Sequence, residues 1–173
     1  MPDKIFIEEN KLFKIDCNKA IEIIELHDEY HKTNILSDVD LIIIDETSII
    51  FMEYKNSSVS NAANPKAFEK SIKEDKHYMK IARKYYDSLI YIDNKTGCEY
   101  KKKNYYYVIE CSKADSVVRK MLAGKIKSRL PFILQGNLQG MKQALIDNFE
   151  VVNIHEWNNK FPDYKFEACA TGT

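Results

Sequence analysis

The chain has 173 residues, of which 45% are hydrophobic, and this size and composition predict one domain over residues 1–173. No apolar run approaches the roughly 20 residues that cross a bilayer, and the N-terminus carries no apolar signal region, which argues against a membrane protein and predicts a soluble, cytoplasmic one. Basic and acidic residues balance at 26 each, but residues 1–60 hold 6 basic against 13 acidic residues and residues 101–130 hold 9 against 2. This distribution indicates either an acidic site facing a basic surface or ordinary solvated faces.

The N-terminal part is expected to hold a hairpin followed by a helix. Apolar residues on both sides of a polar break at 8–11 predict the hairpin over residues 4–16. Either Asp16 or Asn18 can then cap a helix that runs to about Thr33, because apolar residues recur there at helical spacing. The polar side of this helix carries three glutamates, Glu22, Glu25 and Glu29.

Two short apolar runs predict a second hairpin at the centre of the sheet. Residues 39–44 are too few and too rich in β-branched side chains for a comfortable helix, so they predict a buried strand. Residues 45–48 supply turn formers. Residues 49–55 form a second apolar run, which should pair antiparallel with the first.

A turn-rich loop at 56–65 precedes a helix expected from residue 66 to about residue 89. The loop ends in Asn64-Pro65, which favours a helix start, and we expect it to be mobile. Lysines follow one side of the helix, at Lys66, Lys70, Lys73, Lys80 and Lys84. This basic stripe suits the phosphate backbone of a nucleic acid, and it is equally typical of a solvated face.

The C-terminal half is expected to add strands and helices. The expected strands lie at 89–92 and 105–109, on either side of an exposed loop with three lysines at 101–103. Helices at 112–122 and 134–148, a strand at 149–154 and a frayed tail after Trp157 follow. Alternation along a strand places Tyr105 and Tyr107 on one face and Tyr106 on the other, which favours sheet packing over base stacking.

Three residues with the chemistry for metal-assisted hydrolysis meet at one end of the central hairpin. Asp40 begins its first strand, and Glu53 and Lys55 end the second, where alternation puts them on the same face. Magnesium prefers oxygen ligands and is typically held by one or two carboxylates together with substrate phosphate. A metal here would lower the pKa of a bound water, while Lys55 orients or deprotonates that water and offsets charge on a scissile phosphate.

The arrangement resembles the PD-(D/E)xK nuclease superfamily over a core at about residues 18–110, with residues 112–157 as an elaboration. The resemblance implies an α/β fold with a restriction-endonuclease-like core, in which helices flank a central mixed β-sheet. It implies Asp40 and Glu53 as metal ligands, the Tyr54 carbonyl and a helix glutamate, Glu25 or else Glu22, as further ligands, and Lys55 as the catalytic lysine. We therefore expect a nuclease dependent on Mg2+ or Mn2+ that cuts DNA bound along the lysine stripe, and a homodimer is consistent with this class. The family often has proline where this chain has Val39.

Several alternatives stay open. Asp38 has the same strand parity as Asp40 and competes for its role. A module that keeps the nuclease fold could bind nucleic acid or protein without cutting. His27 and His31, one helical turn apart, suggest a zinc metallohydrolase, but Asp28 stands where the HExxH motif has its glutamate and no third ligand is evident. The four cysteines are too far apart in sequence for a CxxC motif, so we expect reduced thiols.

Overall fold

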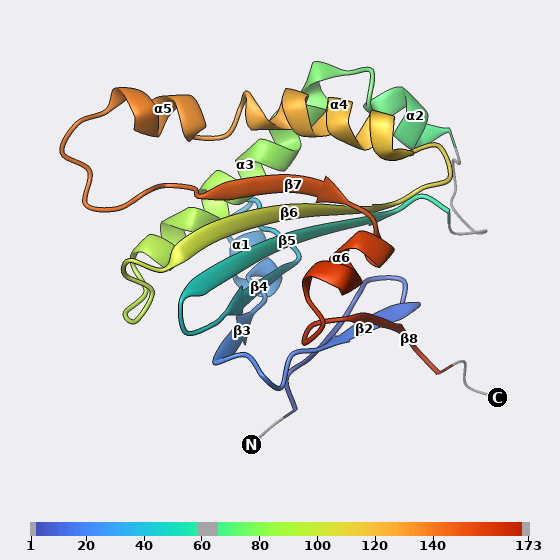
Figure 1. Cartoon of the computed structure of the whole chain (residues 1–173), viewed down its shortest axis with the longest axis horizontal. Coiled ribbons are helices and arrows are strands. Elements are labelled where there is room, and N and C mark those ends of the chain that lie inside the picture. Colours follow the sequence, from blue (N-terminus) through green and yellow to red (C-terminus); the bar gives the residue numbers. More distant parts are fainter. Residues whose placement is uncertain (1–2, 59–65, 171–173) are drawn as a thin grey trace.

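The computed structural model describes residues 3–58 and 66–170. Its centre is a five-stranded mixed sheet in the order β3 (Glu22–Ile24), β4 (Leu41–Ile44), β5 (Ser48–Asn56), β6 (Lys102–Glu110) and β7 (Asn148–Val152). Long helices cover one face of this sheet, and a smaller sheet with one helix covers the other, which gives three layers (Figure 1). The expected α/β architecture, a central mixed sheet flanked by helices, is therefore confirmed.

The predicted central hairpin is present and fixes the register of the sheet. β4 and β5 pair antiparallel, with Leu41 opposite Met52. The turn between them is closed by the Asp45 N–H, which donates to the Ser48 carbonyl at 2.9 Å. β6 then runs parallel to β5 and places Tyr107 beside Glu53, and β7 runs parallel to β6. The carboxyl end of β5 consequently runs beside β6, while its pairing with β4 ends at Met52, one residue before Glu53.

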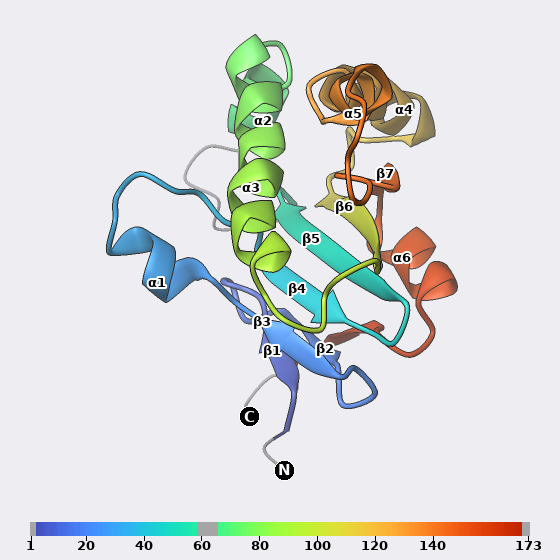
Figure 2. The same ribbon diagram turned by 90° about the vertical axis from the view of Figure 1, so that its left-hand side faces the viewer.

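One face of the sheet packs against helices α3 (Asp75–Asp93) and α4 (Ser116–Lys127), and the shorter helices α2 (Ala67–Ser71) and α5 (Phe132–Asn137) lie in the same layer. Figure 2 shows α3 lying along this face next to β4 and β5. Tyr105 and Tyr107 belong to the core on this face and Tyr106 to the core on the other, as alternation predicts. No helix within residues 3–58 and 66–170 has the length and apolar character needed to span a membrane.

The opposite face is covered by both ends of the chain. β1 (Ile5–Ile7) and β2 (Phe13–Asp16) form the predicted N-terminal hairpin, and β8 (Phe166–Ala168) pairs antiparallel with β2. Helix α6 (Ile154–Lys160) places Trp157, which is fully buried, against the sheet. The Trp157 indole N–H donates to the Tyr164 carbonyl at 2.6 Å. Residues 158–170 of the tail expected to fray after Trp157 are instead ordered, because their aromatic side chains complete this core.

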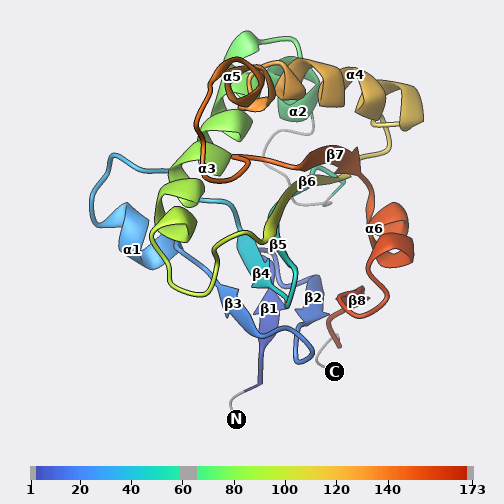
Figure 3. The same ribbon diagram turned by 60° about the vertical axis from the view of Figure 1, so that its left-hand side comes forward.

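The prediction of a helix over residues 18–33 is wrong. Residues 22–24 form β3, in which Ile23 pairs with Ile43, and only α1 (His27–His31) is helical. Asp16 does not cap a helix; its Oδ1 accepts from the Asn18 N–H at 2.9 Å in a local turn. Helix α1 lies beside α3, where the Tyr30 hydroxyl donates to the Asp87 carbonyl at 2.7 Å (Figure 3).

Four further expectations need correction. The single helix expected at 66–89 is two helices, α2 and α3. The segment 89–92 is not the expected strand, because Leu89 and Ile92 extend the buried face of α3 at helical spacing and the helix continues to Asp93. Lys103 is not in an exposed loop: it lies in β6, is 1% exposed, and its Nζ is 2.8 Å from Oδ1 of Asp93. The helix expected at 134–148 ends at Asn137. Residues 59–65 of the predicted mobile loop lie outside the described residues.

Candidate active site

Asp40 and Glu53 lie next to each other on the helix-covered face of the central hairpin. Asp40 directly precedes β4, and Leu41 pairs with Met52, so the next step of the same register sets Asp40 against Glu53. The N–H of Tyr54 donates to Oδ2 of Asp40 at 2.7 Å. The backbone of β5 thereby holds the Asp40 carboxylate against the end of the strand that carries Glu53.

Lys84 of α3 connects the two carboxylates. Its Nζ lies 2.8 Å from Oε1 and 2.9 Å from Oε2 of Glu53, and 3.8 Å from Oδ1 of Asp40. The side chains of Lys84 and Glu53 are only 18% and 10% exposed. Lys84 belongs to the basic stripe predicted to bind nucleic acid, but the structure places its Nζ between the two carboxylates. The signal that could have found it is helical spacing, because Lys84 lies three residues after buried Ile81 and four before buried Ser88.

The burial of this group shifts the protonation of all three residues. Burial raises the pKa of Glu53 to about 8; the charge of Asp40 adds to this rise, and Lys84 opposes it. Burial also raises the pKa of Asp40, again against the effect of Lys84. Burial alone would lower the pKa of Lys84, but the charges of Glu53 and Asp40 outweigh burial and raise it. The carboxylate centre formed by Asp40, Glu53 and Lys84 therefore holds protons more tightly than isolated carboxylates do.

Glu25 is the predicted helix glutamate, and the structure places it in the connection between β3 and α1 rather than on a helix. The pKa of Glu25 is raised by burial, then by the charges of Asp28 and Asp40. Glu25 therefore lies within the electrostatic field of the Asp40 carboxylate. Glu22, the second choice, is engaged elsewhere, because its Oε1 is 3.1 Å from Nζ of Lys95. Of the two glutamates, Glu25 is the one associated with the centre.

Lys55 lies at the rim of the centre. It is exposed, and alternation along β5 places it on the same face as Glu53, two residues further on. Its charge, after burial and Lys80, lowers the pKa of His77. Within the described part of the chain, the Lys55 side chain makes no ion pair with Asp40 or Glu53. The structure therefore brings together Asp40, Glu53 and Lys84, and leaves Lys55 nearby with its ammonium in solvent.

The Tyr54 backbone and side chain point to different surroundings. The Tyr54 ring packs in the core on the opposite face, where its buried hydroxyl has no hydrogen-bond partner among the described residues. Its N–H donates to Asp40. Because the N–H and C=O of one strand residue point to the same neighbouring strand, the Tyr54 carbonyl also faces the side of Asp40. The geometry is consistent with the carbonyl as a metal ligand.

A basic groove of about 490 Å³ lies on the outer side of α3, near the centre. Four cationic side chains line it: Lys76, Lys80, Arg83 and Arg129. Two of them are partly neutralised, since Arg83 pairs with Asp87 at 3.3 Å and Arg129 pairs with Asp75. Lys80 is exposed, and its charge opposes the rise in the pKa of Glu53, so it lies between the groove and the centre.

The remaining lysines of the predicted stripe lie earlier in the chain, before α3. Lys66, Lys70 and Lys73 are exposed around α2 and do not line the groove. Of the predicted stripe, Lys80 alone combines exposure with a position at this groove.

The donor set of Asp40 and Glu53 fits a hard divalent cation, because it consists of carboxylate oxygens that already converge on one cationic atom.

Comparisons of this chain with models of known protein families, with curated proteins and with solved structures found no match.

Proposed function

We propose that the chain is a metal-dependent nuclease that hydrolyses phosphodiester bonds in DNA, with a restriction-endonuclease-like core of the PD-(D/E)xK type. The observation that carries the proposal is the meeting of Asp40 and Glu53 around a single cationic group at the end of the central hairpin. The order of elements supports it, since β4, β5, α3 and β6 follow one another as the resemblance implies.

Mg2+ or Mn2+ would be held by Asp40 and Glu53, with the Tyr54 carbonyl and Glu25 as further ligands. When bound, the metal lowers the pKa of a coordinated water and stabilises negative charge on the phosphate. Asp40 is held in place for this role by the Tyr54 N–H. Glu53 must lose its proton before it can act as a ligand, because its pKa is about 8. It must also release Lys84, whose Nζ lies 2.8 Å from its Oε1.

The two lysines have separate roles in this proposal. Lys84 neutralises the buried carboxylates and keeps them close together in the absence of metal. Lys55, whose exposed ammonium can reach a substrate, orients the attacking water and offsets charge on the scissile phosphate. The groove lined by Lys80 and its neighbours would bind the phosphate backbone next to the centre.

The deciding experiment is incubation of plasmid and single-stranded DNA with the protein in Mg2+ or Mn2+, comparing the wild type with Asp40→Asn. The wild type should cut and Asp40→Asn should not. Glu167→Gln, an exposed change on β8, is the matched control and should cut like the wild type. Equal cutting by wild type and Asp40→Asn would overturn the proposal. DNA binding without cutting by the wild type would favour a binding module with the same fold, in which Lys84 permanently occupies the cation position.

A further inference from the structure

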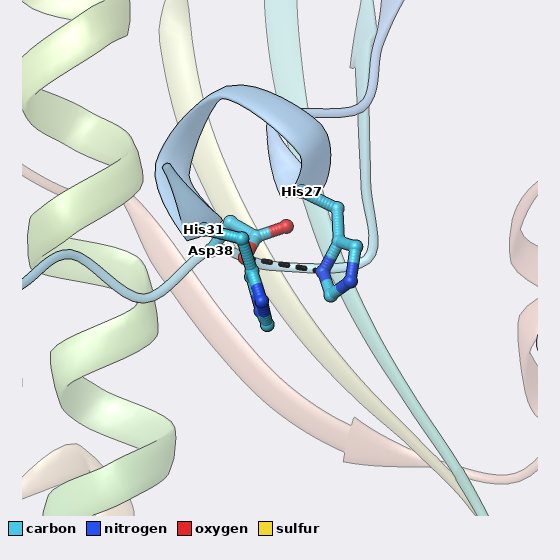
Figure 4. Close-up of side chains that lie close together, drawn as sticks. All are labelled: His27, His31 and Asp38. Atoms are coloured by element: carbon cyan, nitrogen blue, oxygen red, sulfur yellow. Dashed lines mark ion pairs between the residues drawn. The ribbon is translucent and has the colours of Figure 1, made fainter. Parts of the chain in front are cut away.

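A second group of metal-ligating side chains lies at α1, outside the carboxylate centre. His27 and His31 are one helical turn apart on α1, with ring centroids 3.9 Å apart. Asp38, from the segment that leads into β4, joins them (Figure 4). One ligand atom from each residue lies within 4.8 Å of the others. The sequence revealed the two histidines but not the third ligand, because residues 32–37 separate it from the helix.

The Asp38 carboxylate is buried without the donors that a buried carboxylate needs. Its side chain is 9% exposed. It forms an ion pair with Nδ1 of His27, 3.7 Å from its Oδ1, which is too far for a hydrogen bond. Within residues 3–58 and 66–170, no hydrogen bond reaches this carboxylate. A bound cation would supply the compensation that hydrogen bonds do not provide here.

We propose that His27, His31 and Asp38 bind a divalent transition metal, with Zn2+ as the expected ion. Imidazole and carboxylate are common zinc ligands, and a tetrahedral site with bonds of about 2.1 Å brings its ligand atoms to about 3.4 Å from one another. The His27 side chain is 65% exposed and His31 is also exposed, so both rings have room to rotate and close the remaining distance. Buried Asp38 is the fixed ligand. Three protein ligands leave the fourth position to water.

This site differs in chemistry from the carboxylate centre beside it. Asp38 and Asp40 are two residues apart in the segment that leads into β4, so the two sites adjoin. The centre offers only oxygen ligands and suits Mg2+, whereas the α1 site offers two imidazoles and suits zinc. The inference does not depend on nuclease activity, because the α1 site could hold zinc whether or not the chain cuts DNA.

The experiment is calorimetric titration of Zn2+ into the protein after chelator treatment, without a histidine tag. The wild type should bind one Zn2+ at this site, and His31→Ala should weaken that binding at least about tenfold. His31 is exposed, so its removal should leave the fold intact, as circular dichroism would check. His155→Ala, an exposed histidine on α6, is the matched control and should bind like the wild type. Excess Mg2+ should not compete for the site.

Two further variants separate the sites. Asp38→Asn should weaken Zn2+ binding, while Glu53→Gln should leave the α1 site loaded. Co2+ in place of Zn2+ should give the visible absorption of a tetrahedral ion in the wild type and lose it in His27→Gln. Unchanged Zn2+ affinity in both His31→Ala and His27→Gln would overturn the inference, whatever the outcome of the cleavage assay.

Discussion

The Lys84 ammonium donates to both carboxylate oxygens of Glu53, at 2.8 and 2.9 Å, from a helix that crosses the strand carrying Glu53. A residue of α3 thus supplies the charge that a divalent cation would supply at the end of the central hairpin. Since both partners are largely buried, neither can lose the other without a cost in free energy.

Replacing Lys84 with methionine should destabilise the protein strongly at high pH. At pH 9 the ionised Glu53 would lose its buried counter-ion, at a cost of about 3–5 kcal/mol in the free energy of unfolding. The cost should be smaller at pH 6, because Glu53 can take up a proton instead. Urea unfolding at both pH values measures this, and the double variant with Glu53→Gln should recover much of the loss. Equal stability of wild type and Lys84→Met at pH 9 would show that the pair does not stabilise the fold.

Replacing Lys55 with alanine should leave stability nearly unchanged but reduce DNA cleavage. The Lys55 side chain is exposed and outside the ion-pair network, so the free energy of unfolding should change by less than about 0.5 kcal/mol. If Lys55 acts on the attacking water, DNA cleavage should fall by about 100-fold or more. Cleavage assays with Mg2+ beside thermal unfolding measure both effects. Full activity in Lys55→Ala would remove this residue from the mechanism.

The stability of the metal-free protein should depend on pH through Glu53. Because the pKa of Glu53 in the folded protein, about 8, is above its ordinary value of 4.5, the folded state holds a proton that the unfolded chain releases. The resulting stabilisation is complete below pH 4.5 and is lost as pH rises to 8, by up to about 1.4 kcal/mol per pH unit. The unfolding free energy of the wild type minus that of Glu53→Gln should therefore fall from pH 5 to pH 8 and then stay constant. A constant difference would contradict the raised pKa.

The affinity for Mg2+ should rise with pH, whereas the stability of the metal-free protein falls. Below pH 8 a metal must displace the proton of Glu53, so Mg2+ affinity should rise by up to about tenfold per pH unit from pH 6 to pH 8 and then level. Calorimetry in buffers of different ionisation enthalpy should detect the released proton. In Glu53→Gln the affinity should be weak and nearly independent of pH. Equal Mg2+ affinity of the wild type at pH 6 and pH 8.5 would argue against Glu53 as a ligand.

Reversing the charge of Lys80 should weaken DNA binding. Lys80 lines the basic groove proposed to bind the phosphate backbone, so Lys80→Glu should lower affinity and reduce the slope of log affinity against log salt by about 1 or more. Binding measured at several salt concentrations, with an inactive Asp40→Asn background, checks this. Lys165→Glu makes the same charge change at an exposed site near β8 and serves as the control. Equal losses in both variants would mean that the groove has no special role.

The central hairpin could be predicted because its determinants are local. The β-branched runs on either side of residues 45–48 specify two short buried strands and a turn, and pairing across that turn sets Asp40 against Glu53. By contrast, β3 forms because β4 offers an unpaired edge to residues 22–24. Their apolar spacing also satisfies a helix, so nothing within the segment itself decides between the two.

The rest of the candidate site depends on contacts between distant parts of the chain. Lys84 reaches Glu53 across 31 residues, and only its position between Ile81 and Ser88 on the helix indicates that it faces the sheet. Asp38 reaches the α1 histidines because the chain turns back before β4. In each case the sequence shows the residue types, but the partner is determined by packing.

Trp157, the only tryptophan of the chain, lies fully buried on the face of the sheet opposite Asp40 and Glu53. It packs against Phe161 and Phe166, so its emission reports whether the C-terminal segment is docked on the sheet. Metal or DNA bound near the carboxylates should leave that emission unchanged unless the central strands move. Intrinsic fluorescence can therefore distinguish ligand binding confined to the helix-covered face from a rearrangement transmitted through the sheet.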